Sequence, residues 1–400
     1  MTVRVSKPEL NIREKLSELD NSVGNHGSQL MKSADAAESF DLVRAGRKNI
    51  IQNGDQQIWQ RYTTKQSAAG TSLIFISDRW MFEEGCGELV ATVSRSTDTP
   101  AGEGFQYSAQ INVDTVESAI GTGDFAQYMY FVEGYDYQHL EWGTRYAKPA
   151  TLSFWFKTTV SGEHYVSINS SGGADTWSTR IQSPANVWKK HVVTIDPPQS
   201  GTWLSTTNRG IEIRIGLCAS PSVHQSTWNK WYYGGGAYNG FSTANSNLIL
   251  TQNNKSWLTG VQLEVGTVAT PFEFRSYGEE LALCQRYFYR NGGPEHDIIS
   301  QAFSPHTTEI AIAWPHPTEM RASPTVDVVG TETSNKNTNF YFRTTGNTGF
   351  SLTGNGRDIT QMTRHHFSMW FNGMSGVPAA TGQVRVQNDK TVHLHITAEF

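Results

Sequence analysis

The sequence is short of charge and of long apolar runs. Asp, Glu, Lys and Arg make up 17% of its 400 residues, whereas about a quarter is usual. No apolar run approaches the ~18 residues of a membrane-spanning helix. The first residues also lack the apolar stretch of a secretory signal. We therefore expect neither membrane insertion nor export.

Cysteine is scarce as well, since only Cys86, Cys218 and Cys284 occur and they lie far apart. Their odd number and the lack of a Cys-x-x-Cys pair argue against a disulfide framework and against a cysteine metal site. The pattern is typical of thiols kept reduced in a cytoplasm. We expect no cofactor and no metal.

The chain is instead rich in aromatic residues and glycine. Aromatic residues make up 12% of it, including 12 Trp, and there are 36 Gly. Such a composition excludes disorder over most of the length. The net charge of -5 provides no general attraction to nucleic acid. The composition is typical of an extracellular β-protein, and assembly of a virus particle inside a cell would reconcile it with the missing export signal.

Residues 1–48 differ from the rest of the chain. Ile12, Leu16, Leu19 and Val23 recur at spacings of four, three and four, which predicts one apolar helical stripe. A helix this short cannot bury its stripe alone. We interpret the segment as a helical attachment or oligomerisation segment whose partner is another copy of the chain or another protein.

Residues 49–290 have the pattern of a β-sandwich. Short segments rich in β-branched and aromatic residues alternate with Gly, Asn, Ser and Pro clusters. Eight segments are predicted as strands: 73–76, 88–93, 107–113, 151–157, 165–168, 190–195, 211–217 and 257–264. Their period of two and the lack of long helices predict an all-β, antiparallel jelly-roll sandwich. Residues 278–290 alone look helical, and we expect a short connector there.

A smaller β domain is predicted for residues 291–400. Strand patterns occur at 309–314, 325–329, 340–342 and 392–400, and the last of these suggests a C-terminus buried in a sheet. With few Leu and Ile, the core would be thin for one chain, so contacts between chains, most simply in a homotrimer, would complete it.

Sequence motifs of catalysis are missing. There is no GxSxG, HExxH, P-loop or GxGxxG pattern. Carboxylates that could serve a glycosidase occur singly or in pairs, and nothing distinguishes one pair: Glu83, Glu84, Asp136, Glu141, Glu279 and Glu280. We expect no catalytic residues. His365-His366 and His393-x-His395 could chelate a metal, but ordinary sheet positions are the simpler interpretation.

Aromatic clusters are the stronger signal for binding. Residues 228–241 combine ring side chains, glycines and amides, which predicts a mobile loop and not the core of a strand. An aromatic face can stack on a pyranose while amides and hydroxyls bond its hydroxyl groups. The glycan-binding candidates are Trp228, Asn229, Trp231, Tyr232, Tyr233 and Tyr238. The alternative is that these rings cap the sandwich core or face a neighbouring subunit.

Two further groups of residues carry weaker expectations. A second concentration of rings could bind sugar or cap the core in the same way: Tyr128, Tyr130, Tyr135, Tyr137 and Trp142. Asp55, Asp78 and Glu264 could belong to a structural calcium site near the first and last strands. Surface solvation is the simpler expectation for these three carboxylates.

Several ordered blocks between residues 47 and 290 resemble a domain of tailed-phage fibres and prophage tail proteins. The first blocks are RKNIIQNGDQQIWQR (47–61), SDRW (77–80), VSRSTD (93–98), GFQYS (104–108), EGYD (133–136), WGT (142–144) and AKPATLSFW (147–155). The strongest are TGVQLEVG (259–266), ATPFE (269–273) and EELALCQRYF (279–288). The opening segment resembles, over a shorter stretch, N-terminal segments of marine and cyanobacterial phage structural proteins.

The resemblance implies a carbohydrate-binding-module-like jelly roll in a virion protein. Its partners would be other virion proteins of tail or capsid and a host cell-surface glycan, bound without catalysis for adsorption. The family does not assign the sugar contacts, because residues 228–241 fall in a variable part. No heptad run or repeat provides a fibre shaft. A purely structural decoration protein and a polysaccharide depolymerase remain the alternatives.

Overall fold

The computed structural model describes most of the chain beyond its first segment. The described residues are 47–71, 73–171, 175–220, 224–225, 228–234, 241–242, 247–292, 298–306, 308–329, 340–344, 349–375, 384–388 and 393–400. The chain divides into two compact units, residues 1–48 and 49–400. Ile12, Leu16, Leu19 and Val23 lie outside the described residues, so the helical attachment segment stays a prediction.

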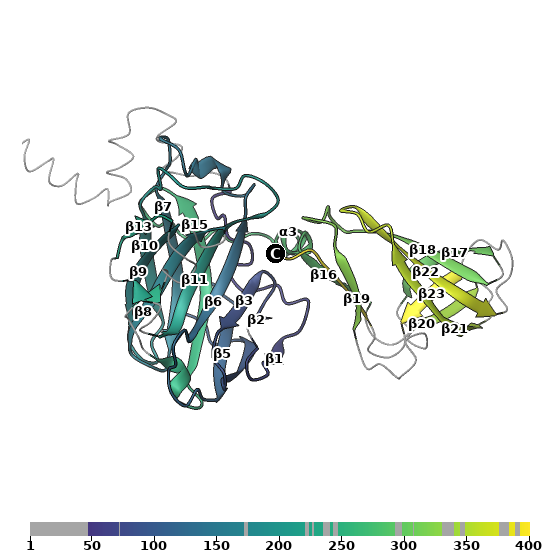
Figure 1. Cartoon of the computed structure of the whole chain (residues 1–400), viewed down its shortest axis with the longest axis horizontal. Helices are drawn as coiled ribbons and strands as arrows, with labels where there is room; N and C mark the ends of the chain where they lie inside the picture. Colours follow the sequence, from purple (N-terminus) through teal and green to yellow (C-terminus); the bar gives the residue numbers. More distant parts are fainter. Residues whose placement is uncertain are drawn as a thin grey trace, which may run out of the picture. The chain divides into compact units, whose positions relative to one another are not determined.

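Two antiparallel sheets form a sandwich (Figure 1). The first contains, in order, β1 (Thr64–Gln66), β4 (Val90–Ser96), β5 (Ser108–Thr115), β15 (Lys255–Val265), β7 (Ala150–Thr158) and β10 (Lys189–Ile195). The second contains β13 (Lys230–Tyr232), β9 (Thr176–Ser183), β8 (Gly162–Ser170), β11 (Arg209–Ala219), β6 (Phe125–Glu133), β3 (Trp80–Glu84) and β2 (Leu73–Phe75). β12 (His224–Gln225) and β14 (Phe241–Ser242) form a short parallel pair. The predicted all-β sandwich class is confirmed.

Alternation of side chains places the core between the sheets. Phe154 and Ile111 of the first sheet and Tyr128, Ile168 and Ile213 of the second are at most 1% exposed. All eight predicted segments coincide with strands. β6 was missed because its run of aromatic residues has no alternation of polar and apolar residues. Its side chains are buried on both faces, as its burial pattern shows.

The helical connector is confirmed as α3 (Tyr277–Gln285), which leads into β16 (Phe288–Asn291). A three-stranded sheet follows, with β24 (His393–Thr397) between β16 and β19 (Thr325–Val329). The remaining strands close a barrel: β17 (Ile298–His306), β18 (Glu309–Pro315), β22 (His366–Ser375), β21 (Gly349–Thr360), β20 (Phe340–Thr344) and β23 (Val384–Asn388). The four predicted strands are present, and Leu394 and Ile396 are buried as expected. The boundary at 290 and the contact between chains stay predictions.

The last residues of the chain are clamped to the sandwich by buried arginines. The Arg79 Nη1 atom lies 2.6 Å from Glu399 Oε2, and the Arg79 and Glu399 side chains are 1% and 9% exposed. Arg61 Nη2 lies 3.3 Å from Glu399 Oε1. Arg321 donates to the carbonyls of Ala398 and Glu399 at 2.7 and 2.8 Å. A single carboxylate therefore neutralises two buried guanidinium groups.

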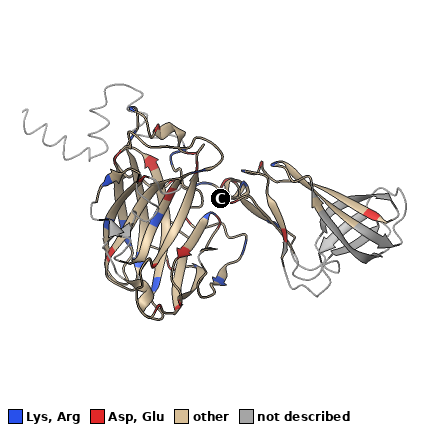
Figure 2. Ribbon diagram, viewed as in Figure 1, with Lys and Arg blue, Asp and Glu red and all other residues tan. Residues whose placement is uncertain are grey.

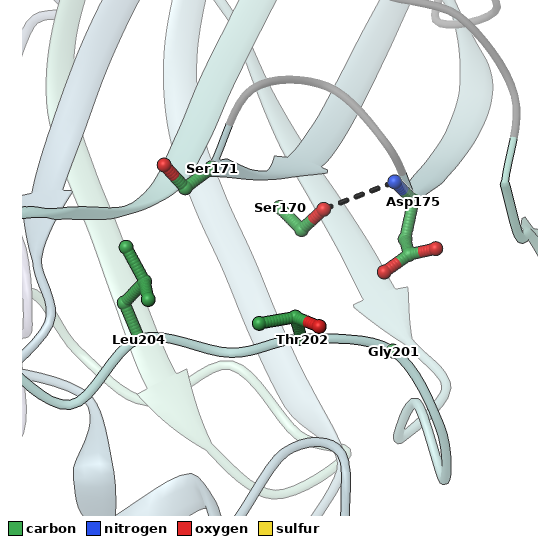
Figure 3. A pocket seen from close by; sticks show the side chains of 6 residues that line it. All are labelled: Ser170, Ser171, Asp175, Gly201, Thr202 and Leu204. Atoms are coloured by element: carbon green, nitrogen blue, oxygen red, sulfur yellow. Dashed lines mark hydrogen bonds between the residues drawn. The ribbon is translucent and has the colours of Figure 1, made fainter.

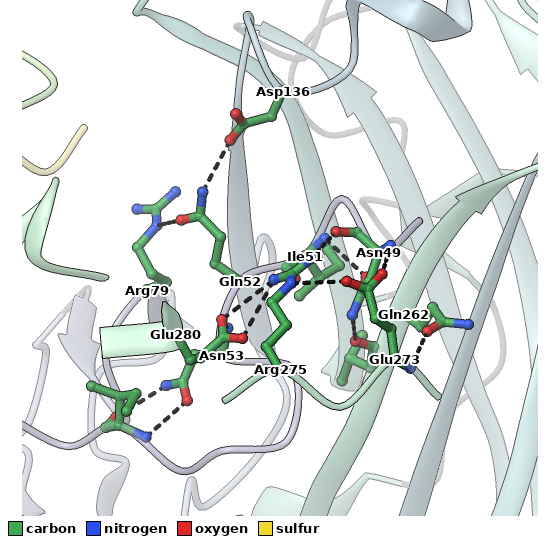
Figure 4. A network of polar contacts seen from close by, with 12 residues as sticks. Asn49, Ile51, Gln52, Asn53, Arg79, Asp136, Gln262, Glu273, Arg275 and Glu280 are labelled. Atoms are coloured by element: carbon green, nitrogen blue, oxygen red, sulfur yellow. Dashed lines mark hydrogen bonds and ion pairs between the residues drawn. The ribbon is translucent and has the colours of Figure 1, made fainter. Parts of the chain in front are cut away.

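A polar network joins the resemblance blocks in space (Figure 4). Arg275 donates to the carbonyl of Ile51 at 3.1 Å and forms ion pairs with Glu273 and Glu280. The Asn49 Oδ1 atom accepts hydrogen bonds from the backbone N–H of Ile51 and of Leu263. These contacts tie residues 49–55 to β15 and α3. The blocks at 47–61, 259–273 and 279–288 therefore hold the fold together.

Charged residues of both signs are interspersed over the described strands (Figure 2). The described part of the chain contains no helix with the length and apolar character that a bilayer span requires.

Candidate functional site

A pocket of about 240 Å³ lies between the β8–β9 turn and the loop that follows β10. It is lined by Ser170, Ser171, Asp175, Gly201, Thr202 and Leu204 (Figure 3). Apart from one leucine, the lining is a carboxylate, three hydroxyls and backbone. Carbon atoms nevertheless make up more of the exposed lining than polar atoms do, so such a wall suits a ligand that has both apolar surface and hydrogen-bonding groups.

Asp175 is the charged group of this pocket, and it is held by its backbone. Its N–H donates to Ser170 Oγ at 3.0 Å, and its carbonyl accepts from the Ser170 N–H at 2.8 Å. The side chain is 5% exposed, and Oδ1 accepts the Gly234 N–H at 3.3 Å. Within the described residues, Asp175 forms no ion pair. The carboxylate is thus preorganised and keeps acceptor positions for a ligand.

Gly201 lets the loop approach this carboxylate. Its φ of +95° belongs to the left-handed region, and a Cβ at this position would overlap Asp175 Oδ2. Any other residue would displace either the loop or the carboxylate. The pocket therefore requires glycine here.

The aromatic segment reaches this pocket as a strand, so the prediction of a loop at 230–232 is wrong. β13 pairs with β9 in the register Trp231↔Trp177 and Tyr232↔Thr176, which places Tyr232 opposite the residue after Asp175. Alternation along β13 turns Trp231 towards the core and leaves Tyr232 44% exposed. Tyr233 is 46% exposed, and the Gly234–Asp175 bond holds this stretch at the pocket.

Trp231 itself has a packing role. Its ring centroid lies 5.6 Å from that of Trp142 and 5.2 Å from that of Trp203, both nearly perpendicular. Its Nε1 donates to the Asp196 carbonyl at 2.6 Å. For this residue the structure agrees with the core-capping alternative, because the indole is occupied by protein neighbours.

The other predicted contact residues either pack against β9 away from the pocket or lie outside the described residues. Trp228 is half-buried, and the Arg180 guanidinium lies 5.0 Å from its ring centroid. Asn229 donates its N–H to the Ser178 carbonyl at 2.8 Å and accepts from Thr179 Oγ1 at 2.5 Å. Tyr238 lies outside the described residues. Of the candidates, Tyr232 and Tyr233 are exposed on the segment that Gly234 joins to Asp175, but neither lines the pocket.

The second aromatic concentration is mostly buried, and one of its rings, Tyr137, contacts a pocket residue. Tyr128, Tyr130, Tyr137 and Trp142 are at most 4% exposed, whereas Tyr135 is 54% exposed. Tyr137 Oη donates to the Leu204 carbonyl at 2.7 Å, and burial raises the pKa of this phenol. Four of these five rings therefore pack in the protein and do not offer a face to sugar.

Sequence reasoning missed a row of buried polar side chains beside the pocket. Asn169 and Ser167 of β8 pair with Glu212 and Arg214 of β11. Asn169 Nδ2 donates to Thr176 Oγ1 at 3.1 Å, which connects this row to Asp175. In the described part of the chain, Asn169 Oδ1 and Ser167 Oγ have no hydrogen-bond partner. The signal was the alternation of polar residues with isoleucines in Ile211–Ile215, which marks a strand with one polar face.

β14 lies against β8, β9 and β11, over this part of the sheet. Another buried polar contact of the second sheet joins β6 and β3, where the Gln127 Nε2 atom donates a hydrogen bond to Glu83 at 2.5 Å. Burial raises the pKa of Glu83, opposed by Arg214. The row is thus a buried polar layer of the second sheet and does not line the pocket.

The carboxylates considered for calcium or catalysis are used by the fold. Asp55, Asp78 and Glu264 are at most 5% exposed, so the expectation of surface solvation is wrong. Glu264 accepts from the Thr270 N–H and Oγ1 at 2.8 and 2.7 Å. Burial raises the pKa of Asp78 to about 6 although Arg61 opposes it.

The other carboxylates and the histidines show no convergent site. Asp136 accepts from Gln52 Nε2 at 3.1 Å, whereas Glu280 belongs to the Arg275 network. The Nε2 atoms of His393 and His395 lie 3.0 Å apart. In the described part of the chain, no group of three His, Cys, Asp or Glu side chains is arranged to hold a metal ion.

No protein-family model and no curated protein sequence matches the chain. Among solved structures it is similar to the enzymatically active domain of tailspike protein 4 of bacteriophage CBA120, with 13% identity, a TM-score of 0.30, and coverage of 55% of this chain and 21% of that one. An arabinose-bound α-L-arabinofuranosidase has 14% identity and a TM-score of 0.28, over 60% of this chain and 30% of that one.

A third similar structure is the family 11 carbohydrate-binding module of a cellulosomal cellulase of Clostridium thermocellum. It has 13% identity and a TM-score of 0.25, over 51% of this chain and 99% of the module. The chain thus spans about a fifth of the tailspike chain and under a third of the arabinofuranosidase chain. These scores are too low for the likeness to say what this chain binds.

Proposed function

We propose that the chain is a non-enzymatic, tail-fibre-like virion protein that binds a host-surface glycan at the Asp175 pocket. The observation that carries the proposal is the Asp175 pocket, together with the exposed Tyr232 and Tyr233 on the segment that the Gly234–Asp175 hydrogen bond joins to it. The resemblance of residues 47–290 to tail-fibre domains supports the virion role.

Different side chains would recognise the apolar face and the hydroxyl groups of a sugar. A tyrosine ring is apolar on its face and would cover the C–H face of a pyranose. Asp175, Thr202 and Ser171 would accept or donate hydrogen bonds to its hydroxyl groups. Because two hydrogen bonds hold the Asp175 backbone and the Gly234 N–H bonds its carboxylate, little conformational entropy of this residue would be lost on binding.

Assembly would strengthen a weak single site. In this proposal, residues 1–48 attach the chain to other virion proteins and the chains form a homotrimer. Linked sites raise the effective concentration of glycan without any new contact. Three weak pockets on one particle would then hold a cell surface firmly.

A glycan array with the purified protein tests the proposal. We expect retention of specific glycans by the wild type and a loss of roughly tenfold or more in affinity in the Tyr232→Ala, Tyr233→Ala double variant. Tyr277→Ala is the matched control, because Tyr277 is 60% exposed at the start of α3 and lies outside the segment that is hydrogen-bonded to Asp175. Silence of the array together with stable incorporation into particles would favour a purely structural role. New reducing ends from host polysaccharide would instead identify a depolymerase.

A further inference from the structure

Resting on the proposed glycan site, we propose that the Asp175 pocket takes a sugar unit without an anionic group and rejects uronate units. The pocket carries one charged side chain, and that charge is negative. Its ligand must therefore offer hydroxyl donors to a carboxylate rather than a second carboxylate.

Asp175 is a nearly buried acidic residue of the pocket. Its carboxylate is 5% exposed and receives the Gly234 N–H. None of the six lining residues is Lys, Arg or His, and no ion pair involving Asp175 occurs among the described residues. A buried carboxylate that lacks a cation still needs hydrogen bonds to replace its lost hydration. Two neighbouring sugar hydroxyls would supply them.

The loop at Gly201 lies so close to Asp175 that a ligand in the pocket would contact the Asp175 carboxylate. Asp175 Oδ2 occupies the space that a Cβ of residue 201 would need, so the carboxylate lies directly against the loop that forms the facing wall. Figure 3 shows Asp175, Gly201 and Thr202 side by side around the pocket. A ligand group that enters between them contacts Asp175.

The nearby charges do not cancel that of Asp175. Lys230 is exposed on β13, two residues before Tyr232, and its backbone pairs with Ser178, further along β9 from the pocket. Asp196, whose carbonyl receives the Trp231 indole, is exposed, lies outside the pocket lining and supplies no positive charge. Like charges brought together in a partly buried site cost several kcal/mol, and salt screens such a site less than an exposed one.

The experiment compares neutral and acidic sugars of the same linkage. The probes are six-unit oligosaccharides in three pairs: glucose with glucuronate, galactose with galacturonate, and mannose with mannuronate. For the pair that the protein retains, we expect the neutral member to bind the wild type roughly tenfold or more tightly than the acidic member. Asp175→Asn should bring the two affinities to within a few-fold, because it removes the charge and keeps an oxygen for the Gly234 N–H.

The controls separate charge at the pocket from general effects. Asp196→Asn removes one negative charge outside the pocket and should leave the preference unchanged. Melting temperatures of the variants report whether the fold is intact, which we expect for Asp175→Asn because the Ser170 bonds use only its backbone. Equal or tighter binding of the acidic member by the wild type, or an unchanged preference in Asp175→Asn, overturns the inference. If no glycan of either kind is retained, the proposed function itself fails.

Discussion

Replacement of Glu399 by Gln should strongly destabilise the protein. Glu399 is the shared counter-charge of Arg79, at 2.6 Å, and Arg61, at 3.3 Å. Arg79 is also confined by the Tyr287 ring, at 3.5 Å from its guanidinium carbon. The Gln side chain has the same shape but no charge, so both guanidinium groups would stay buried without their carboxylate.

The magnitude follows from burial. Removal of one partner of a buried ion pair costs about 3–5 kcal/mol, because the other charge is left uncompensated. Asp78 lies 3.7 Å from Arg61 and compensates part of the loss, whereas Arg79 has no second carboxylate among its ion pairs in the described residues. We therefore expect a loss of about 3 kcal/mol or more in the free energy of unfolding.

Urea unfolding followed by far-ultraviolet circular dichroism measures this loss. Glu163→Gln is the matched control, since the Glu163–Arg180 pair has a similar distance of 3.0 Å but side chains that are 44% and 39% exposed. Exposed pairs contribute about 0–1 kcal/mol. If Glu399→Gln costs no more than Glu163→Gln, the clamp does not stabilise the fold as we argue.

Three further substitutions test the packing of the sandwich and the pH dependence of its stability. Trp231→Ala should lower the free energy of unfolding in urea by about 3–5 kcal/mol. Tyr232→Ala should change it by less than about 0.5 kcal/mol. Equal losses in the two variants would contradict the assignment of Trp231 to packing. Burial lowers the pKa of His164 to about 4 from its ordinary value of 6.5, so between these pH values the unfolded chain binds a proton that the folded chain does not. Stability should fall as pH drops from 6.5 towards 4, by at most about 3 kcal/mol from this residue, and His164→Asn should flatten the fall; parallel pH profiles would exclude this cause.

The sandwich could be predicted because most of its strands are locally patterned. β11 alternates isoleucine with Glu212 and Arg214, and β24 alternates Leu394 and Ile396 with histidines. Strand β6 has no such pattern, because apolar neighbours cover both of its faces. β13 was mistaken for a loop because a three-residue edge strand is too short to show a period.

The pocket and the clamp could not be predicted from local patterns. Asp175, Gly201 and Gly234 come from three segments, and only the folded chain brings them together. Arg79 and Glu399 are separated by 320 residues. The rings were found from composition alone, but which of them are exposed depends on the β9–β13 register.

The packing of Trp142, Trp203 and Trp231 also has an optical consequence. The ring centroids lie 4.9–5.6 Å apart with interplanar angles of 75–86°, close enough for their excited states to couple. Trp203 lies within the pocket loop, between the lining residues Thr202 and Leu204. Any ligand that shifts this loop would change the coupling, so the native chain carries its own unlabelled spectroscopic sensor of occupancy.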